Sequence, residues 1–297
     1  MIILKIQGGL GNQMFEYAFG RAVQLKLGDV LLLDTSEFAY DEQRDYSLNH
    51  FCLGNNQVED DSGKYNSRYD QRANKMLKLG GKLCSGLQYV LLSKFGYYIW
   101  DYAKYKKVKV NRHRTVYLHG YWQAYDYFSD IIDTIREELR VKEPPQVCNM
   151  EMLSEIRNSN SVCVHVRRGD FLLSSNKLCN CSVEYYISAM EYLESIDDNL
   201  VFYIFSDDII DVKKNFSFGK HNVIFVEQRN PDYEELRLMY NCKHFIIANS
   251  TFSWWAAVLA KRKGKKVVAP LVWYTDHRDV SHLLLQDWNI IENKMGE

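Results

Sequence analysis

The second half of the chain alternates between short runs of Val, Ile and Phe and longer stretches with helical spacing. Runs rich in β-branched and aromatic residues suit buried strands, and apolar residues three or four apart suit helices. Such alternation predicts one parallel sheet with right-handed crossovers, and therefore an α/β fold. The expected strands span residues 162–166, 200–205, 223–226, 245–248 and 266–269, and the expected helices span residues 183–196, 232–242 and 252–262.

Polar residues follow three of these expected strands at the point where each strand ends. In a parallel sheet the carboxyl ends of the strands lie on one edge, and ligands bind in the crevice outside that edge. The three segments are therefore predicted to form one binding site. They consist of Arg167, Arg168 and Asp170 after the first strand, Ser206, Asp207 and Asp208 after the second, and Asn249, Ser250, Thr251, Phe252 and Ser253 after the fourth.

The chemistry of this edge favours an anionic ligand. The guanidinium groups of Arg167 and Arg168 offer donors matched to phosphate oxygens. Segment 249–253 opens a helix, where free amides and the helix dipole favour anions. For the arginines the alternative is a surface salt bridge, for example between Arg168 and Asp170. For the helix start it is simple N-capping by a Ser or Thr hydroxyl, which is compatible with phosphate binding.

The acidic residues of the same edge suit hydroxyl groups better than phosphate. Asp207 and Asp208 can accept hydrogen bonds from a sugar or a guanine edge, bind a metal, or cap the following helix. The chain contains no Asp-x-Asp pair, and two arginines with a helix terminus can neutralise a leaving diphosphate without metal. Cys179 and Cys181 lack the second pair of ligands that zinc sites have. We therefore predict neither a metal nor another cofactor.

The amino-terminal part of the chain carries a second pattern. Residues 2–6 predict a strand, and the glycine-rich segment 7–13 predicts a turn that lets the backbone approach a ligand closely. A helix is expected to follow and to stop at Gly28. The next strand, 30–33, completes a βαβ unit similar to a dinucleotide-binding fingerprint, although its third glycine is missing. A ligand-binding loop and a structural turn are both compatible with this pattern.

Two further segments of the first half bear on an acceptor. A strand expected over 115–118 runs into the segment 119–123, His-Gly-Tyr-Trp-Gln. Aromatic and amide side chains suit sugar stacking and hydroxyl recognition, but Tyr and Trp also fill protein cores. Segment 104–114 carries six Lys or Arg and no acidic residue. It fits a strand with one solvated face, or a basic rim that meets an anionic or membrane-borne acceptor.

Composition bounds the domain number and the cellular context. The 297 residues suffice for two domains, and Pro144-Pro145 breaks an expected helix over 131–140. We expect domains 1–145 and 146–297, with the last helix packing back on the first domain. The net charge of −1 gives no indication of nucleic-acid binding. Seven scattered cysteines fit reduced thiols, and neither a signal peptide nor a run of about 18 apolar residues is present, so we expect a soluble, cytoplasmic protein.

Four motifs of the chain occur in the order typical of the bacterial galactoside α-1,2-fucosyltransferases, which the sequence resembles. They span residues 8 to 255, most of the chain, and the second and fourth together are highly specific. Glu16, directly after the first motif, stands where that family more often has glutamine. The motifs are Gly8-Gly-Leu-Gly-Asn-Gln-Met-Phe15, His165-Val-Arg-Arg-Gly-Asp170, Phe205-Ser-Asp-Asp208 and Asn249-Ser-Thr-Phe-Ser-Trp-Trp255.

The resemblance implies a GT-B-like fold, in which two Rossmann-like domains face each other across a cleft. It implies GDP-β-L-fucose as the donor substrate, a terminal β-galactoside as the acceptor, and inversion to an α-1,2 linkage. The implied partners are this donor and a glycan acceptor, with peripheral contact to a membrane-borne glycolipid at the inner membrane face. The implied context is the assembly of a bacterial surface polysaccharide or glycolipid.

The resemblance also implies roles for individual residues. In related fucosyltransferases the first arginine of the second motif contacts the β-phosphate, which assigns a catalytic role to Arg167, and Asn12 falls near the fucose and the acceptor. We expect acceptor contacts at Gln13, Trp122 and Gln123. The implied donor-binding residues are Gly9, Leu10, Gly11, His165, Arg168, Asp170, Ser206, Asp207, Asp208, Asn249, Ser250, Thr251, Phe252 and Ser253. The residues considered for the general base are Glu16, Asp34, Asp126 and Asp170.

Two other functions compete with this interpretation. One is a transferase of the same fold with another deoxysugar nucleotide as donor, or with another linkage such as α-1,6. The other is a non-catalytic protein that binds a nucleotide sugar. A kinase or a phosphatase is disfavoured, because the chain has no Walker pattern and no nucleophilic cysteine attached to the second motif.

Overall fold

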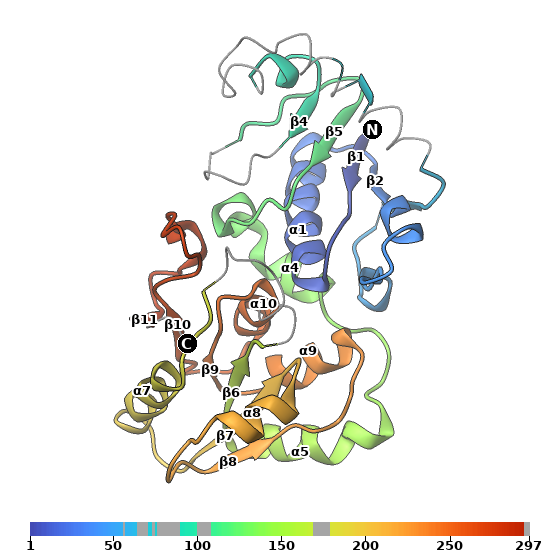
Figure 1. Ribbon diagram of the computed structural model, residues 1–297. Coiled ribbons are helices and arrows are strands. Elements are labelled where there is room, and N and C mark those ends of the chain that lie inside the picture. Colours follow the sequence, from blue (N-terminus) through green and yellow to red (C-terminus); the bar gives the residue numbers. More distant parts are fainter. Residues whose placement is uncertain are drawn as a thin grey trace. The chain divides into compact units, whose positions relative to one another are not determined.

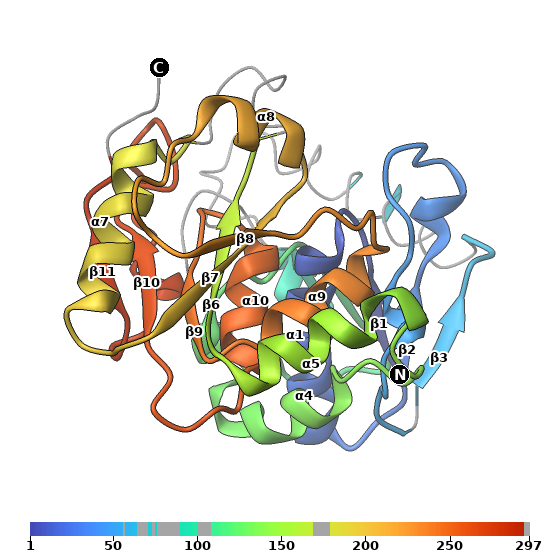
Figure 2. The same ribbon diagram turned by 90° about the horizontal axis from the view of Figure 1, so that it is seen from below.

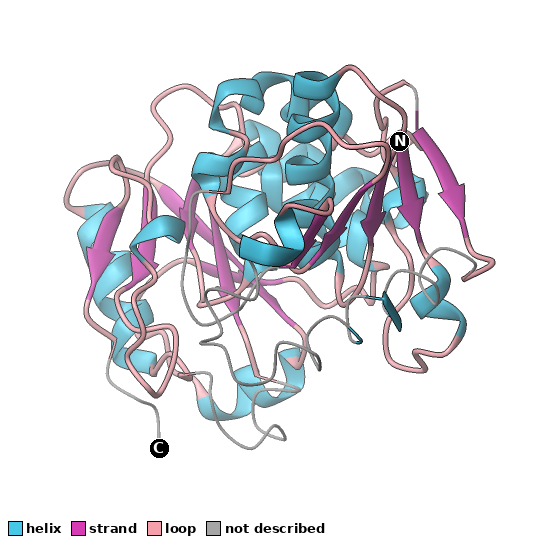
Figure 3. Cartoon of the chain, turned by 90° about the horizontal axis from the view of Figure 1, so that it is seen from above, coloured by secondary structure: helices cyan, strands magenta, loops and turns pink. Residues whose placement is uncertain are grey.

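The structure, a computed structural model, divides the chain into two compact units, Met1–Leu139 and Arg140–Glu297. The boundary lies a few residues before Pro144-Pro145, the pair that marks a domain break in the sequence. Each unit contains its own sheet, and the strands gather in these two sheets in Figures 1 and 3. The structure describes residues 1–55, 57–63, 71–72, 75, 90–99, 108–168 and 179–293.

The first unit is built on a parallel sheet with the strand order β3-β2-β1-β5-β4. Its βαβ opening is as predicted: β1 and β2 pair in parallel, with Ile2 opposite Leu31, and α1 connects them. α1 ends at Gly28, whose φ of 61° is left-handed and whose N–H donates to the carbonyl of Gln24. The strands are β1 (Ile2–Lys5), β2 (Leu31–Asp34), β3 (Gln57–Asp60), β4 (Tyr97–Ile99) and β5 (Val116–His119), and the helices include α1 (Leu10–Leu27), α4 (Ile132–Glu138) and the 3-10 helices η1 (Ser36–Ala39), η2 (Leu48–His50), η3 (Tyr125–Tyr127) and η4 (Ser129–Ile131).

The second unit is built on a parallel sheet with the order β11-β10-β9-β6-β7-β8, and it contains all five strands predicted for this half. On one face, Val164 and Ile204 pack against Tyr186 and Met190 of α7. The helices α5, α9 and α10 lie on the opposite side of β6 and β9 from α7 (Figure 2). The strands are β6 (Asn160–Val166), β7 (Leu200–Ser206), β8 (Val223–Phe225), β9 (His244–Ile246), β10 (Val267–Pro270) and β11 (Asn289–Ile291), and the helices include α5 (Met150–Asn158), α7 (Val183–Glu194), α8 (Ile209–Asn215), α9 (Asp232–Tyr240), α10 (Thr251–Leu259) and the 3-10 helices η5 (Val147–Asn149) and η6 (Ser281–Leu283).

A few elements differ from the sequence-based expectation. The edge strands β3, β4 and β11 were not predicted, because they are short and β3 is polar and largely exposed. Residues 108–110, expected to belong to a strand, have no regular structure, and the next N–H, that of Asn111, donates to the Tyr98 hydroxyl. The last described element, β11, is a strand that pairs in parallel with β10.

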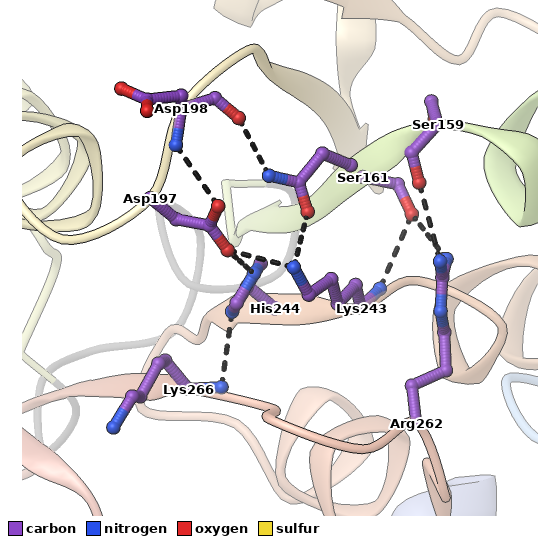
Figure 4. Close-up of polar contacts among 9 residues, drawn as sticks. Ser159, Ser161, Asp197, Asp198, Lys243, His244, Arg262 and Lys266 are labelled. Carbon is purple, nitrogen blue, oxygen red and sulfur yellow. Dashed lines mark hydrogen bonds and ion pairs between the residues drawn. The ribbon is translucent and has the colours of Figure 1, made fainter.

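The amino-terminal edge of the second sheet is held by a network of charged side chains (Figure 4). Asp197 accepts hydrogen bonds from Lys243 Nζ at 2.7 Å and from His244 Nε2 at 3.0 Å. Nδ1 of His244 accepts the N–H of Lys266 at 3.1 Å, which places the imidazole proton on Nε2. The hydrogen bond from Lys243 is the main cause that lowers the pKa of Asp197 to about 2. This network links the start of β9 to the segment before β7 and to the residue before β10.

Candidate functional site

The carboxyl edge of the second sheet brings together the three polar segments predicted to converge there. β9, β6 and β7 are neighbours in the sheet. The register places Val166 opposite Ser206, so β6 and β7 end at the same level, and it places Val164 opposite Ile246, so β9 ends two residues earlier. The segments that follow them therefore lie side by side, as the sequence predicted.

Arg167 lies directly after β6 in an ion pair that solvent can reach. Its Nη1 is 3.2 Å from Oδ2 of Asp207, and the two side chains are 19% and 24% exposed. The other oxygen of Asp207 accepts the backbone N–H of Arg168 at 2.8 Å. A phosphate offers a guanidinium the same kind of charge-assisted hydrogen bond as this carboxylate does. Arg167 can therefore exchange its carboxylate partner for an anionic ligand.

Arg168, in contrast, is held firmly by side chains of its own unit. Its Nε donates to Oδ2 of Asp211 at 2.6 Å, and its guanidinium carbon lies 5.2 Å from the ring centroid of Phe216. The salt bridge considered from the sequence thus exists for Arg168 with Asp211, while Asp170 lies outside the described residues. These contacts make Arg168 an anchor for the segment that carries Arg167.

His165 is the buried member of the second motif. It is 2% exposed, and its ring centroid lies 6.0 Å from that of Phe252 at the start of α10. Burial, reinforced by the positive charge of Arg167, lowers the pKa of His165 to about 3. The imidazole is therefore neutral at pH 7. It packs between the Arg167 segment and α10 as an uncharged group, which does not add a positive charge for a phosphate.

The first turn of α10 is partly accessible at this edge. Oγ of Ser250 accepts the N–H of Phe252 at 3.3 Å, which is the N-capping considered from the sequence. Ser250, Thr251 and Phe252 are all partly exposed. Ser253 is fully buried, and its Oγ donates to the carbonyl of Ala248 at 3.5 Å. The hydroxyl of Ser253 therefore faces the interior, and the donor contact expected at this residue stays a prediction.

Two other expected donor contacts are engaged inside the unit. Asn249 is 3% exposed, and its side-chain amide donates to two backbone carbonyls. Asp208 is the N-cap of α8: its Oδ1 accepts the N–H of Asp211 at 3.0 Å, and its own N–H donates to Oγ of Ser206 at 3.1 Å. Asn249 and Asp208 therefore shape the edge, and the structure does not present them as direct ligand contacts.

The glycine-rich turn of the first unit follows β1 at the carboxyl edge of its sheet. Gly8 has a φ of 73°, and a Cβ there would lie 3.0 Å from Nδ2 of Asn12 and 3.2 Å from the hydroxyl of Tyr121. A side chain does not fit this position. Gln123 donates to Oδ1 of Asn12 at 2.8 Å. The predicted residues Asn12 and Gln123 therefore meet beside the turn, together with Tyr121.

The residues that follow the turn belong mostly to the interior. Gly9 is the N-cap of α1 and is partly exposed, without a side chain to cap the helix. Leu10 and Gly11, in the first turn of α1, are buried. A ligand at this turn would therefore meet backbone groups near Gly9 and not the side chain of Leu10.

Two expected acceptor contacts, Gln13 and Trp122, are core residues. Gln13 is fully buried, and its Nε2 donates to the carbonyls of Gly8 and Asp45, both at 2.8 Å. Trp122 is also fully buried and stacks on Phe19 with the ring centroids 4.1 Å apart. Its φ of 49° is left-handed, a rare conformation for a tryptophan. Both side chains are therefore used in the interior, and the acceptor contacts expected for them stay predictions.

The carboxylates considered for the general base differ in access. Glu16 is fully buried and accepts the N–H of Gln7 at 2.9 Å, and burial raises its pKa well above the usual range. Asp34 is fully buried as well, and burial raises its pKa. Asp126 is exposed on η3, and Asp170 lies outside the described residues. Glu16 and Asp34 are therefore not accessible to a substrate in this structure.

One titratable group near Arg167 gave no signal in the sequence. Glu235 lies on α9 and is partly exposed. Burial and the negative charge of Asp207 raise the pKa of Glu235 to about 7, against the opposing charge of Arg167. α9 precedes β9 and carries none of the four motifs, so sequence patterns did not point to this residue. The carboxyl group of Glu235 therefore keeps its proton to a higher pH than an ordinary glutamate does.

The described residues share three general properties. They contain no group of three or more His, Cys, Asp or Glu arranged to hold a metal ion. In the same part of the chain, no helix has the length and apolar character that crossing a membrane requires. The cysteines that the structure describes, six in number, are free thiols.

Comparisons with known proteins place the chain in a family. Residues 82–292 match the sequence profile of glycosyl transferase family 11. The chain belongs to this family. An alpha-1,2-colitosyltransferase of Escherichia coli is 32% identical over 286 residues, covering 92% of this chain and 92% of the relative. A galactoside alpha-(1,2)-fucosyltransferase 1 of Plecturocebus brunneus is 26% identical over 155 residues, covering 48% of this chain and 42% of the relative.

Family 11 membership agrees with the fold. The crystal structure of NodZ alpha-1,6-fucosyltransferase co-crystallized with GDP aligns with a TM-score of 0.55, covering 87% of this chain and 92% of that chain at 13% identity. The fold is GT-B-like, as the motifs predicted, with two parallel sheets flanked by helices. The resemblance noted from the motifs is confirmed at the level of the family, since the matched region includes the second, third and fourth motifs.

Proposed function

We propose that the protein transfers L-fucose from GDP-β-L-fucose to the 2-hydroxyl of a terminal β-galactoside, with inversion to an α-1,2 linkage. The observation that carries the proposal is the accessible ion pair of Arg167 with Asp207. Arg167 follows β6, and the neighbouring strand β9 leads into α10. A guanidinium with an exchangeable partner and a helix N-terminus both favour a diphosphate. Membership of family 11 and the similarity to α-1,2-transferases support the type of reaction.

In the proposed reaction the galactose 2-hydroxyl attacks the anomeric carbon of fucose from the face opposite to GDP. The bond from this carbon to the β-phosphate oxygen breaks as the new glycosidic bond forms, so the products are GDP and the fucosylated galactoside. The hydroxyl proton passes to water or to a carboxylate. Negative charge grows on the β-phosphate, and Arg167 with the α10 amides stabilises it more strongly in the transition state than in the ground state.

We also propose that transfer needs no metal ion. The positive charge that a divalent metal supplies in many sugar-nucleotide enzymes is supplied here by the guanidinium of Arg167 and the first-turn amides of α10. Asp207, which could have bridged a metal to a diphosphate, pairs with Arg167 and accepts the N–H of Arg168. Activity in the presence of EDTA tests this part of the proposal.

The decisive experiment measures GDP release from GDP-fucose, with and without lactose, in EDTA. Release that lactose stimulates and EDTA leaves unchanged supports metal-independent transfer to galactose, and NMR of the product identifies the linkage. Saturable GDP binding without release, over a panel of galactosides, would instead indicate a protein that binds nucleotide sugars without transferring them.

GDP-colitose is a second candidate donor, because the colitosyltransferase relative aligns with 92% of this chain. Colitose is fucose without its 3-hydroxyl, so both donors present the same diphosphate to Arg167. The preference is the ratio of the two kcat/KM values, measured with both donors and one galactoside. A preference for GDP-fucose of about tenfold or more supports the proposal. The opposite preference assigns the protein to colitose.

A further inference from the structure

Asn249 joins three chain segments at the carboxyl edge of the second sheet. It stands between β9 and α10 and is 3% exposed. Its Nδ2 donates to the carbonyl of Cys179 at 2.6 Å and to the carbonyl of Trp273 at 2.9 Å. The N–H of Cys179 donates to the same Trp273 carbonyl at 3.0 Å. Both amide hydrogens of Asn249 are therefore used on backbone groups of two other segments.

The two segments that Asn249 holds flank the proposed donor site. Cys179 begins the described stretch that leads into α7, and Trp273 lies in the loop that follows β10, the strand next to β9. A second buried amide supports the same loop: Asn293 accepts the N–H of Val272 and donates to its carbonyl, both at 2.8 Å. The side-chain amide of Asn249 is thus the link between this supported loop, the Cys179 stretch and the first turn of α10.

The oxygen of Asn249 is occupied as well. The thiol of Cys181 donates to its Oδ1 at 3.9 Å. A buried amide whose hydrogens and oxygen all have partners has little capacity left for a ligand. It can influence binding only through the groups that it places, and the group nearest in the chain is Ser250, the N-cap of α10.

We propose that Asn249 is a positioning residue, which sets the donor site by fixing the Cys179 stretch and the Trp273 loop against the first turn of α10. This inference rests on the proposed use of α10 and Arg167 for the diphosphate of the donor. The asparagine of the fourth motif then acts through its NH2 group on the protein backbone and does not contact the nucleotide.

The pair Asn249→Ala and Asn249→Asp separates this role from a direct donor contact. Aspartate keeps the shape and the acceptor oxygen of asparagine, but it turns a carboxylate oxygen toward two carbonyl oxygens, which repels them. Both variants are expected to raise the KM for GDP-fucose at least about tenfold with a smaller change in kcat, because a displaced α10 loses binding geometry. The KM for the galactoside is expected to stay within about twofold.

His244→Ala is the matched control, since it removes a buried polar side chain from the other end of the same strand. His244 is 1% exposed and bonds to Asp197 and to the N–H of Lys266 (Figure 4). The His244→Ala variant is expected to lower the melting temperature as Asn249→Ala does, but its KM for GDP-fucose is expected to equal that of the wild type. A donor KM that is unchanged in Asn249→Asp, or equally raised in His244→Ala, would overturn the positioning role.

Two additions keep the test informative in every case. If neither variant folds, Asn249→Ser replaces them, because its short hydroxyl cannot reach both carbonyls and the same donor KM shift is expected. Calorimetry measures the affinity for GDP, and so reports the same effect without turnover. If the wild-type protein binds GDP but transfers no fucose, only the proposed function is contradicted. If the folded Asn249 variants bind GDP as tightly as the wild type does, only the positioning role is contradicted.

Discussion

Neighbouring residues of one motif have different physical roles in this protein. Arg167 and Arg168 are adjacent and identical, yet Arg168 donates to Asp211 at 2.6 Å and packs over Phe216, while Arg167 makes a longer ion pair of 3.2 Å with Asp207. The difference arises because consecutive residues that leave a strand point in different directions. One arginine therefore anchors the segment, and the other is the one that we propose for the diphosphate.

Replacing Arg167 should therefore have a much larger effect on turnover than on stability. Arg167→Ala is expected to lower kcat with GDP-fucose by roughly 10²-fold or more, by comparison with the loss of one preorganised donor at a developing negative charge. Its ion pair with Asp207 is partly exposed, so its removal should cost little stability. Steady-state kinetics and thermal unfolding on the same preparation check both expectations.

Arg157→Ala is the control for this substitution. Arg157 lies at the end of α5 in the same unit and donates to Asn241 on the surface. It should leave kcat unchanged, since α5 leads into β6 at the opposite edge of the sheet. Turnover of Arg167→Ala close to that of the wild type would remove Arg167 from the proposed mechanism.

At the residue scale the sequence predicted which segments meet at the sheet edges, but not how each side chain in them is used. It selected the segment 119–123, yet it could not tell which of the adjacent aromatic residues Tyr121 and Trp122 faces the glycine turn. The left-handed φ of Trp122 and its stacking on Phe19 decide this, and both depend on tertiary packing. The role of Asn249 could not be predicted either, because asparagine is a common ligand-binding residue. Only the structure shows that its amide donates to the carbonyls of Cys179 and Trp273, which are distant in the sequence.

Among the elements, the central strands of the second sheet were predictable because they are long and buried on both faces. β6 and β7 are seven residues each and mostly buried, and β7 is almost continuously apolar, which gives a strong signal. β4 and β11 have three residues each, too few to show a period, and they form only because a longer neighbour offers its edge. The central strands alone fix which loops meet at the carboxyl edge, so the site could be predicted before the whole sheet.

The short helix α8 provides an element-scale prediction. Asp208 caps it by accepting the N–H of Asp211. Asp208→Ala should destabilise the second unit by about 1 kcal/mol, whereas Asp208→Asn, which also caps helices well, should retain most of the stability. Because the carboxylate is used on the helix, neither substitution should change the KM for GDP-fucose more than about twofold. Chemical unfolding and donor kinetics of the two variants test this.

The outcome for Asp208 also separates two interpretations of the third motif. In one, both aspartates contact the nucleotide. In the other, Asp207 pairs with Arg167 and Asp208 serves α8. A donor KM that rises strongly in both Asp208 variants, with stability unchanged, would favour the first interpretation and contradict the assignment made from the structure.

Over the whole molecule, buried titratable groups act on stability in opposite directions as pH changes. Burial lowers the pKa of His165 to about 3 and also lowers the pKa of His244. The unfolded chain binds protons at these positions from about pH 6.5 downward while the folded protein does not, so the free energy of unfolding falls as pH falls. Glu235 has the opposite effect on the free energy of unfolding, because its pKa in the folded protein is raised to about 7.

Glu235→Gln should isolate this second contribution. In the wild type the unfolded chain releases the Glu235 proton near pH 4.3, whereas the folded protein releases it near pH 7, so stability decreases as pH rises between these values. Glutamine does not titrate, and the melting temperature of the variant relative to the wild type should therefore rise from pH 4 to pH 7 and level off above pH 8. His165→Asn removes a histidine whose burial lowers stability as pH falls. The melting temperature of this variant relative to the wild type should therefore be highest toward pH 3. A difference between Glu235→Gln and the wild type that is the same at pH 4 and pH 8 would mean that the folded protein releases the Glu235 proton in the same pH range as the unfolded chain, and that the carboxyl group near Arg167 and Asp207 is fully ionised at neutral pH.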